Sequence, residues 1–244
     1  MSTVTQTQHN ESTGRIDDVD WALAERELDS FGYATTTTLL NASECKALIS
    51  MFGDDSAFRS HIDMARYRFG EGEYKYFADP LPPAVAKLRE GVYPRLAGIA
   101  NRWNERLGID QRFPESLDRF LAFCHGKKQR KPTPLVLRYE AGGYNCLHQD
   151  LYGEVSFPLQ MTIVLSDRGV DYTGGQFLLV QQRPRAQSRG DAIELERGQA
   201  IIFPNRYRPV RGTRGDYRVN VRHGVSRIVS GVRFSLGIIF HDAK

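Results

Sequence analysis

The sequence predicts an α+β fold, in which a C-terminal double-stranded β-helix, or jelly roll, is backed by N-terminal helices. Two observations predict it. Apolar residues recur at helical spacing in the first half of the chain, and after residue 131 short β-prone segments follow one another with turn residues between them. The composition, 41% hydrophobic and 25% charged over 244 residues, is that of a globular protein and excludes disorder, collagen and coiled coil.

Composition along the chain predicts the domain organisation. Residues 1–19 are polar and rich in Ser, Thr and Gln, so we expect a flexible tail there. Residues 20–244 are expected to form one domain, with a helical layer at about 20–130 and the jelly-roll core at about 132–242.

The N-terminus has neither the basic nor the apolar region of a signal peptide, and no segment approaches the roughly 18 apolar residues of a membrane span. The 3 cysteines show no CxxC spacing, which favours a reducing compartment over a disulfide framework. We therefore expect a cytoplasmic protein without a membrane partner.

Helix caps and apolar spacing predict three helices in the helical layer. Their expected bounds are Trp21 to Gly32 with Asp20 as the cap, Asn41 or Ser43 to about Met51, and Pro82 or Pro83 to Leu107. The threonine-rich run 33–40 favours a strand. The run 67–77 alternates aromatic residues around two glycines and predicts a β-hairpin. In the C-terminal half the expected strands are 135–139, 144–150, 159–166, 176–181, 200–203, 217–223 and 232–240.

A candidate metal site begins with His148 and Asp150. They lie two residues apart on a predicted strand or strand end, and the two-residue period of a strand sends both side chains the same way. A His-x-Asp pair alone is a weak signal, but His223 ends another strand-like run further along the chain. Two histidines and one carboxylate can form the facial triad that is typical of non-haem Fe(II) oxygenases.

The last predicted strand places Arg233, Ser235 and Gly237 on one face and apolar residues on the other. Together with the triad, this order of residues resembles the Fe(II)/2-oxoglutarate dioxygenases, whose pattern is His-x-Asp, a distal His, and an Arg or Lys about ten residues on. Three further segments look like those of AlkB-type demethylases and prolyl hydroxylases: 137–144 before the His-x-Asp motif, the Gly-Gly strand entry at 172–177, and 198–204 before the distal His.

A closer resemblance covers residues 66–242. It rests on the segments 69–77, 132–135, 147–154, 182–189 and 237–242, which look like those of a bacterial oxygenase family described as acting on alkylated DNA. Gly-Gly-Gln-Phe at 174–177, where the family has Gly-Gly-Glu-Phe, is a departure outside the metal set.

These resemblances imply cofactors, roles and an activity. His148, Asp150 and His223 would bind Fe(II), and 2-oxoglutarate and dioxygen would be co-substrates. Arg233 would pair with the distal carboxylate of 2-oxoglutarate, a geometry that suits a guanidinium group, with Tyr139 and Ser235 as weaker candidates for the same ligand. The implied activity is oxidative demethylation of alkylated nucleic acid, with release of succinate, CO2 and formaldehyde.

Positive charge predicts where nucleic acid would bind. The protein has a formal charge of +4, but residues 181–244 hold 13 Lys and Arg against 5 Asp and Glu. We expect the Arg-rich region 183–227 to contact phosphates, with a tyrosine stacking on a base. The arginines are Arg183, Arg185, Arg189, Arg206, Arg208, Arg211, Arg214 and Arg218, and the tyrosines are Tyr144, Tyr152 and Tyr207. The alternative is a solvated loop whose charges pair with Asp191, Glu194 and Glu196.

Other functions stay open at this point. The distal His to Arg spacing of ten looks more like prolyl hydroxylases than AlkB-type enzymes, which favours a hydroxylase of a protein side chain or small metabolite. A binding or sensing module without turnover is a third alternative, which the intact triad disfavours. Gln160 and Thr162 alternate with apolar neighbours, a pattern that allows them to face the pocket without assigning them a role.

Overall fold

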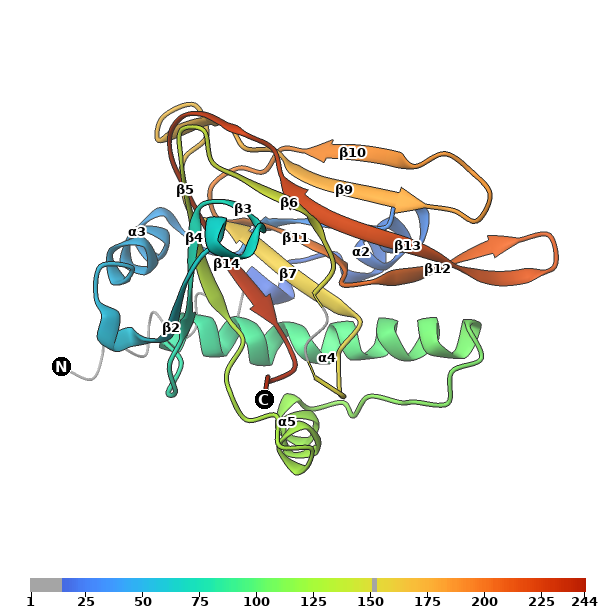
Figure 1. Ribbon diagram of the computed structural model, residues 1–244. Coiled ribbons are helices and arrows are strands. Elements are labelled where there is room, and N and C mark those ends of the chain that lie inside the picture. The colour runs from blue at the N-terminus through green and yellow to red at the C-terminus, as the bar shows by residue number, and fades with distance from the viewer. Residues whose placement is uncertain (1–14, 151–152) are drawn as a thin grey trace.

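The computed structural model describes residues 15–150 and 153–244, and two antiparallel sheets form its centre (Figure 1). The larger sheet has the order β1 (Ala34–Thr38), β11 (Gln199–Pro204), β7 (Leu159–Val164), β14 (Ile228–Ile239), β5 (Leu135–Glu140), β4 (Glu73–Phe77) and β2 (Phe58–Asp63), and β8 (Tyr172–Gly174) also pairs with β14. The smaller sheet has the order β10 (Arg189–Ile193), β9 (Phe177–Gln182), β13 (Gly215–Val225), β6 (Tyr144–His148) and β3 (Gly70–Glu71), and β12 (Tyr207–Gly212) pairs with β13.

The helices belong to the N-terminal half, as the sequence predicts. They are α2 (Trp21–Ser30), α3 (Ala42–Met51), α4 (Pro83–Arg106) and α5 (Leu117–Gly126). Asp20 caps α2 by accepting the N–H of Leu23 at 2.8 Å. Asn41 caps α3 in a capping box with Glu44. Both caps are local contacts, which explains why the sequence places these helix starts correctly.

The main hydrophobic core lies between α4 and the larger sheet, because the apolar stripe of α4 faces the strands. Val92, Leu96 and Trp103 of the helix are buried against a cluster that includes Leu236 and Ile238 of β14. A second core lies between the two sheets and includes Tyr139, Phe177, Phe203 and Val221. The larger sheet is therefore covered on both faces, by α4 on one side and by the smaller sheet on the other.

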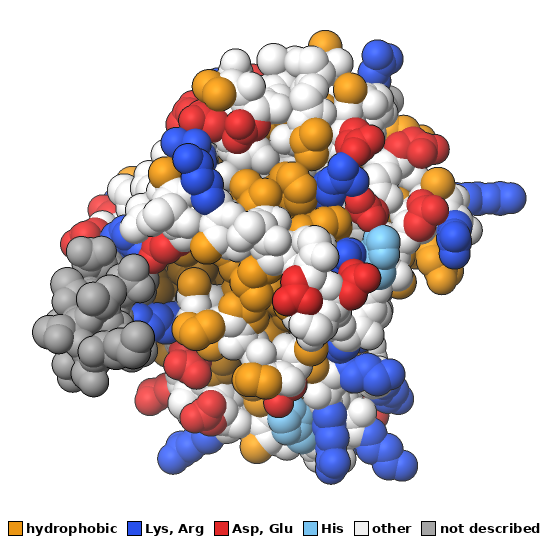
Figure 2. All heavy atoms as spheres, turned by 90° about the vertical axis from the view of Figure 1, so that its left-hand side faces the viewer, with side chains coloured by type: hydrophobic (Ala, Val, Ile, Leu, Met, Phe, Trp, Pro, Cys, Tyr) orange, Lys and Arg blue, Asp and Glu red, His pale blue; other side chains and the backbone are white. Residues whose placement is uncertain are grey.

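One face of the molecule is hollowed. On the side where α3 and β2 lie in Figure 1, Figure 2 shows hydrophobic side chains gathered in a central hollow, with side chains of both charges around it. No helix among residues 15–150 and 153–244 is both long enough and apolar enough to cross a membrane.

The predicted tail is wrong for residues 15–19. Residues 15–17 are helical, Ile16 and Val19 are buried, and Arg15 pairs with Glu44 at 2.6 Å. Two apolar side chains in a polar run are enough to fix this segment on the core. Residues 1–14 of the predicted tail lie outside the described residues.

The predicted hairpin at 67–77 is also wrong. Strand β3 pairs with β6 in the smaller sheet, whereas β4 pairs with β2 and β5 in the larger one. Gly72 lies between them with a φ of 150°, and a Cβ there would stand 2.7 Å from the Tyr139 ring. The run therefore crosses from one sheet to the other. Helix α5 and strands β2, β8, β10 and β12 have no counterpart among the expected elements.

Candidate metal centre

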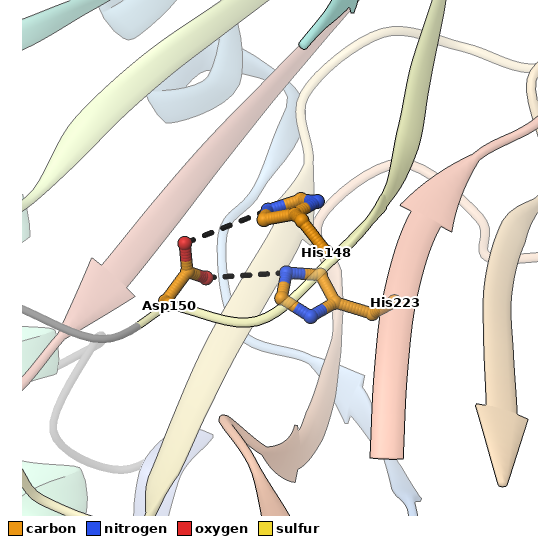
Figure 3. A group of neighbouring side chains, drawn as sticks. All are labelled: His148, Asp150 and His223. Carbon is orange, nitrogen blue, oxygen red and sulfur yellow. Dashed lines mark ion pairs between the residues drawn. The ribbon is translucent and has the colours of Figure 1, made fainter. Parts of the chain in front are cut away.

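Two histidines on strands of the smaller sheet and an aspartate just after one of these strands meet between the sheets (Figure 3). His148 ends β6, Asp150 follows two residues later, and His223 lies on β13. Asp150 Oδ1 lies 3.5 Å from Nε2 of His148, and Asp150 Oδ2 lies 3.2 Å from Nε2 of His223. One ligand atom from each residue lies within 4.8 Å of the others, so the three can hold one metal ion.

Strand pairing places the two histidines. His148 and His223 are directly opposite in the antiparallel pair β6–β13, and directly paired residues share a face of the sheet. Between the ligands, Gln149 turns away and donates from Nε2 to the carbonyl oxygens of Arg206 and Val221, at 2.8 Å each. The bond to Val221 fixes the segment that carries Asp150 to β13, the strand that carries His223, and the bond to Arg206 fixes it to the link between β11 and β12.

Hydrogen bonds orient the candidate ligands. Nδ1 of His148 donates to the carbonyl of Cys146 at 2.8 Å, because a carbonyl oxygen can only accept, and this leaves the lone pair on Nε2. Gln160 of β7 donates from Nε2 to Asp150 Oδ2 at 2.9 Å. The sequence allowed Gln160 to face the pocket without giving it a role, and the structure gives it a bond to the candidate carboxylate ligand.

The electrostatics of the centre suit a cation. Burial would raise the pKa of Asp150, but hydrogen bonds from the two imidazoles and their charge hold it well below its usual value. Burial and repulsion by His148 lower the pKa of His223. Although burial disfavours the charged form of His148 too, Asp150 raises its pKa. The site thus offers an ionised carboxylate and a neutral His223.

A cavity of about 460 Å³ opens onto the three residues. Its wall also includes Tyr139, Asn145 and Ser235. A second hollow of about 670 Å³ is lined by His61, Glu73 and Arg138, which pair with one another. The larger hollow contains none of the three candidate ligands, so the smaller cavity is the one that can serve chemistry at a metal.

Arg233 lies beneath the wall of the smaller cavity. It is 1% exposed and stands directly opposite Tyr139 in the pair β14–β5. Its Nη1 donates to Ser235 Oγ at 3.2 Å, and its Nε has no hydrogen-bond partner within the described parts of the chain. Burial raises the pKa of Tyr139 to about 12, so its hydroxyl keeps its proton and can donate. The structure thus brings together Tyr139, Arg233 and Ser235.

Comparison with known proteins identifies the family. A family model, Oxygenase-NA, described as "Oxygenase, catalysing oxidative methylation of damaged DNA", matches residues 72–243. The chain belongs to this family. Two uncharacterized proteins of Mycobacterium tuberculosis, from strains CDC 1551 / Oshkosh and ATCC 25618 / H37Rv, are each 52% identical to it over 167 residues, which are 68% of this chain and 72% of theirs.

Solved structures confirm the fold of this Oxygenase-NA protein. An oxidoreductase of the 2OG-Fe(II) oxygenase family from Burkholderia pseudomallei has a TM-score of 0.51 at 12% identity, over 93% of each chain. A prolyl hydroxylase from Trichoplax adhaerens, in complex with a hypoxia inducible factor peptide fragment, has a TM-score of 0.51 at 13% identity, over 95% of this chain and 91% of that one. The predicted double-stranded β-helix is therefore confirmed.

The protein is an oxygenase by its family and has the fold of the 2OG-Fe(II) oxygenases, as the sequence predicts. Its residues fit both cofactors. A set of two imidazoles and one carboxylate suits Fe(II), with positions left open for other ligands. The buried guanidinium of Arg233 forms no ion pair with any carboxylate of the described residues, so an acidic co-substrate would supply the missing partner.

The arginines of the Arg-rich region fall into three groups: buried, ion-paired, and exposed without an ion pair. Arg208 does not face solvent: it is 2% exposed, donates to Gln181 at 2.8 Å and to the carbonyl of Asp29 at 2.7 Å, and so is wrong as a phosphate contact. Arg189 and Arg211 pair with neighbouring aspartates. Exposed arginines without an ion pair in the described chain are Arg183, Arg185, Arg206, Arg214, Arg218, Arg222 and Arg227.

The candidate base-stacking tyrosines differ in setting. Tyr207 of β12 is flanked by two guanidinium groups, those of Arg218 at 4.9 Å and Arg206 at 5.8 Å from its ring centroid. Tyr144 is 39% exposed on β6. Tyr152 lies outside the described residues.

The alternative expectation is a loop whose arginines pair with three acidic residues. Of these, Asp191 pairs with Arg189. The other two, Glu194 and Glu196, pair with Arg168.

Proposed function

We propose that this enzyme oxidises alkyl groups on nucleic acid. An N-methyl group, 2-oxoglutarate and O2 would give an N-hydroxymethyl group, succinate and CO2, and the hydroxymethyl group would then leave as formaldehyde. Fe(II), held by His148, Asp150 and His223, would supply the activation of dioxygen. The observation that carries this proposal is the triad in the wall of a cavity, with the buried guanidinium of Arg233 behind the wall residue Ser235 and in no ion pair with the described residues.

The other residues of the cavity would bind and orient the co-substrate. Arg233 would pair with the distal carboxylate of 2-oxoglutarate, since a planar guanidinium matches a carboxylate with two parallel hydrogen bonds. Ser235 accepts a hydrogen bond from Arg233 and so fixes the direction of the guanidinium group. Tyr139, whose hydroxyl accepts from Asn145 at 3.2 Å, would donate its own proton to the ligand.

Nucleic acid as the partner is supported by charge on one sheet. Arg218 and Arg222 alternate with the buried residues Val219, Val221 and His223 along β13, so they point away from the metal centre on the outer face. Across this face a tyrosine is flanked by two guanidinium groups. Unpaired cations next to an aromatic ring form the combination that binds the backbone and a base of a single strand.

A hydroxylase of a protein side chain or small metabolite is the second candidate. The observation that favours it is the apolar part of the cavity wall, which includes Tyr74, Tyr76, Leu135 and Leu137. Such a wall would accept a hydrophobic side chain as readily as the flat face of a base.

The test compares substrates and variants in one assay. Protein with Fe(II), 2-oxoglutarate and air is supplied with methylated single- or double-stranded oligonucleotides, or with peptide and metabolite pools, and succinate and formaldehyde are measured. We expect both products with an oligonucleotide.

The same assay tests the site residues. His148→Ala and Asp150→Ala should abolish both products and weaken Co(II) binding, whereas Arg233→Ala should mainly raise the KM for 2-oxoglutarate. His61→Ala, on the charged hollow, is the control. Unchanged turnover in His148→Ala refutes the ligand set, and succinate with a peptide alone favours the hydroxylase.

A further inference from the structure

An exposed aromatic turn, residues 67–69, stands at the mouth of the metal cavity. Tyr67 ends the short 3-10 helix η2 (Ala65–Tyr67), and Arg68 separates it from Phe69. The rings of Tyr67 and Phe69 are stacked, with centroids 5.5 Å apart and planes 19° apart, yet the two residues are 56% and 46% exposed. Aromatic side chains contribute most when they are buried, so a stacked pair left in solvent indicates a contact surface.

The aromatic turn is held firmly from below. Met64 is fully buried, and its carbonyl accepts the N–H groups of Tyr67 and Phe69 at 3.1 Å each. The carbonyl of Phe69 accepts the N–H of Cys146 at 2.8 Å, which ties the turn to β6, the strand that carries the first histidine of the triad. A surface that is already ordered loses little conformational entropy when a ligand binds.

The position of the turn relates it to the cavity. Arg68 and Phe69 line the same cavity of about 460 Å³ as the triad, whereas Tyr67 does not line it. The stack therefore begins at the cavity wall and continues outward. Arg68 has a left-handed backbone, with φ at 59°, and forms no ion pair with the described acidic residues. An aromatic ring and an unpaired cation thus lie together at the mouth of the cavity in which we propose that oxidation takes place.

We infer that the aromatic turn holds the nucleotide next to the one that is oxidised: its base stacks on Tyr67 and its phosphate contacts Arg68. This inference rests on the proposed function. The target base would enter the cavity, and its neighbour on the same strand would remain at the mouth, where the ring of Tyr67 is exposed. A flat base matches the ring and a phosphate matches the cation, whereas a neutral apolar peptide would leave Arg68 without a partner.

Binding provides the first test, and it does not need turnover. A fluorescently labelled single-stranded oligonucleotide with one methylated base is titrated with protein, and anisotropy gives the Kd. We expect Tyr67→Ala to raise the Kd about tenfold, and Tyr67→Phe, which keeps the ring, to bind as the wild type does. The control is Phe123→Ala, because Phe123 is 51% exposed on α5 and does not line the cavity. Equal affinity of Tyr67→Ala and the wild type would overturn the inference.

Turnover provides the second test. The methylated mononucleoside has no neighbouring base, so Tyr67→Ala should lower kcat/KM about tenfold for the oligonucleotide and leave it unchanged for the mononucleoside. An equal loss on both substrates would place Tyr67 against the target base and overturn the inference. If the wild type binds the oligonucleotide with the expected dependence on Tyr67 but releases no formaldehyde, the proposed function fails and the aromatic turn stands. A wild type that binds no oligonucleotide refutes both.

Discussion

At the scale of single residues, the surroundings of Asp150 decide how it can act as a ligand. Its Oδ2 accepts a hydrogen bond from Gln160, a residue that is 4% exposed on a central strand of the larger sheet. A buried amide donor at one carboxylate oxygen limits rotation of the group and would hold it in place for a metal ion. Because Gln160 does not contribute a ligand atom, we describe it as a positioning residue.

Replacing Gln160 by Leu, which has a similar volume, should weaken metal binding by about 10- to 100-fold. The measurement is anaerobic calorimetric titration with Fe(II), or with Co(II), which needs no turnover. Gln182→Leu is the matched control, because the Gln182 amide also donates hydrogen bonds, to the carbonyl oxygens of Arg183 and Ala186, but at the exposed end of β9 and not to the metal site. Equal metal affinity in both variants would show that Gln160 has a packing role only.

At the scale of elements, the β12–β13 hairpin carries arginines in two different settings. Arg208 on β12 is buried and its bonds reach Asp29 at the end of α2 and Gln181 of β9, so it fastens the hairpin to the helical layer. Burial lowers the pKa of this guanidinium to about 10. Arg218 on the paired strand is exposed and contacts only the ring of Tyr207 among the interactions of the described chain.

We predict opposite effects for these two arginines. Arg208→Ala should reduce the free energy of unfolding by about 3 kcal/mol, because it leaves buried acceptors without a donor. Arg218→Ala should leave the stability unchanged, weaken oligonucleotide binding, and reduce its dependence on salt by about one phosphate contact. Urea unfolding and binding at several salt concentrations measure the two effects. The assignment fails if Arg208→Ala unfolds at the same urea concentration as the wild type.

At the scale of the whole molecule, the last residues of the chain join the helical layer to the barrel. Arg89 of α4 donates to the carbonyl oxygens of Ile239 and Phe240 and to Asp242 at 2.8 Å. His241, between them, is 1% exposed, and its Nδ1 accepts the N–H of Phe157 at 3.2 Å. Burial and the charge of Arg89 lower the pKa of His241 to about 4.

This buried histidine predicts how stability changes with acid. The unfolded chain binds the proton with a pKa of about 6.5, and the folded chain binds it only near 4, so protons favour unfolding between these values. The free energy of unfolding should fall by up to about 3 kcal/mol as the pH drops from about 6.5 to 4. His241→Asn, which retains an acceptor for Phe157, should lose this part of the dependence. Chemical denaturation of the metal-free protein measures it, with His61→Asn as the control.

Particular residues show how much of the fold and of the metal site the sequence alone predicts. Asp20 and Asn41 mark helix starts correctly because a cap acts within one turn of the chain. His148 and Asp150 meet at one site as expected, but strand β6 ends at His148, so the segment after the strand and not the strand period places Asp150. By contrast, the aromatic alternation of the run 67–77 predicts one hairpin, but pairing partners far along the chain put its two strands, β3 and β4, in different sheets. Burial of Arg208 beneath α2 depended on such distant contacts too.

The amino-acid sequence by itself determined the family, the helical and β halves of the chain, and the three candidate ligands, because these depend on residue type and short spacings. Only the tertiary structure decided that His148 and His223 are opposite one another, that Gln160 reaches Asp150, and that the aromatic turn stands at the cavity mouth. Each of these contacts joins segments that are distant in sequence, and their register is set by packing of the whole sheet.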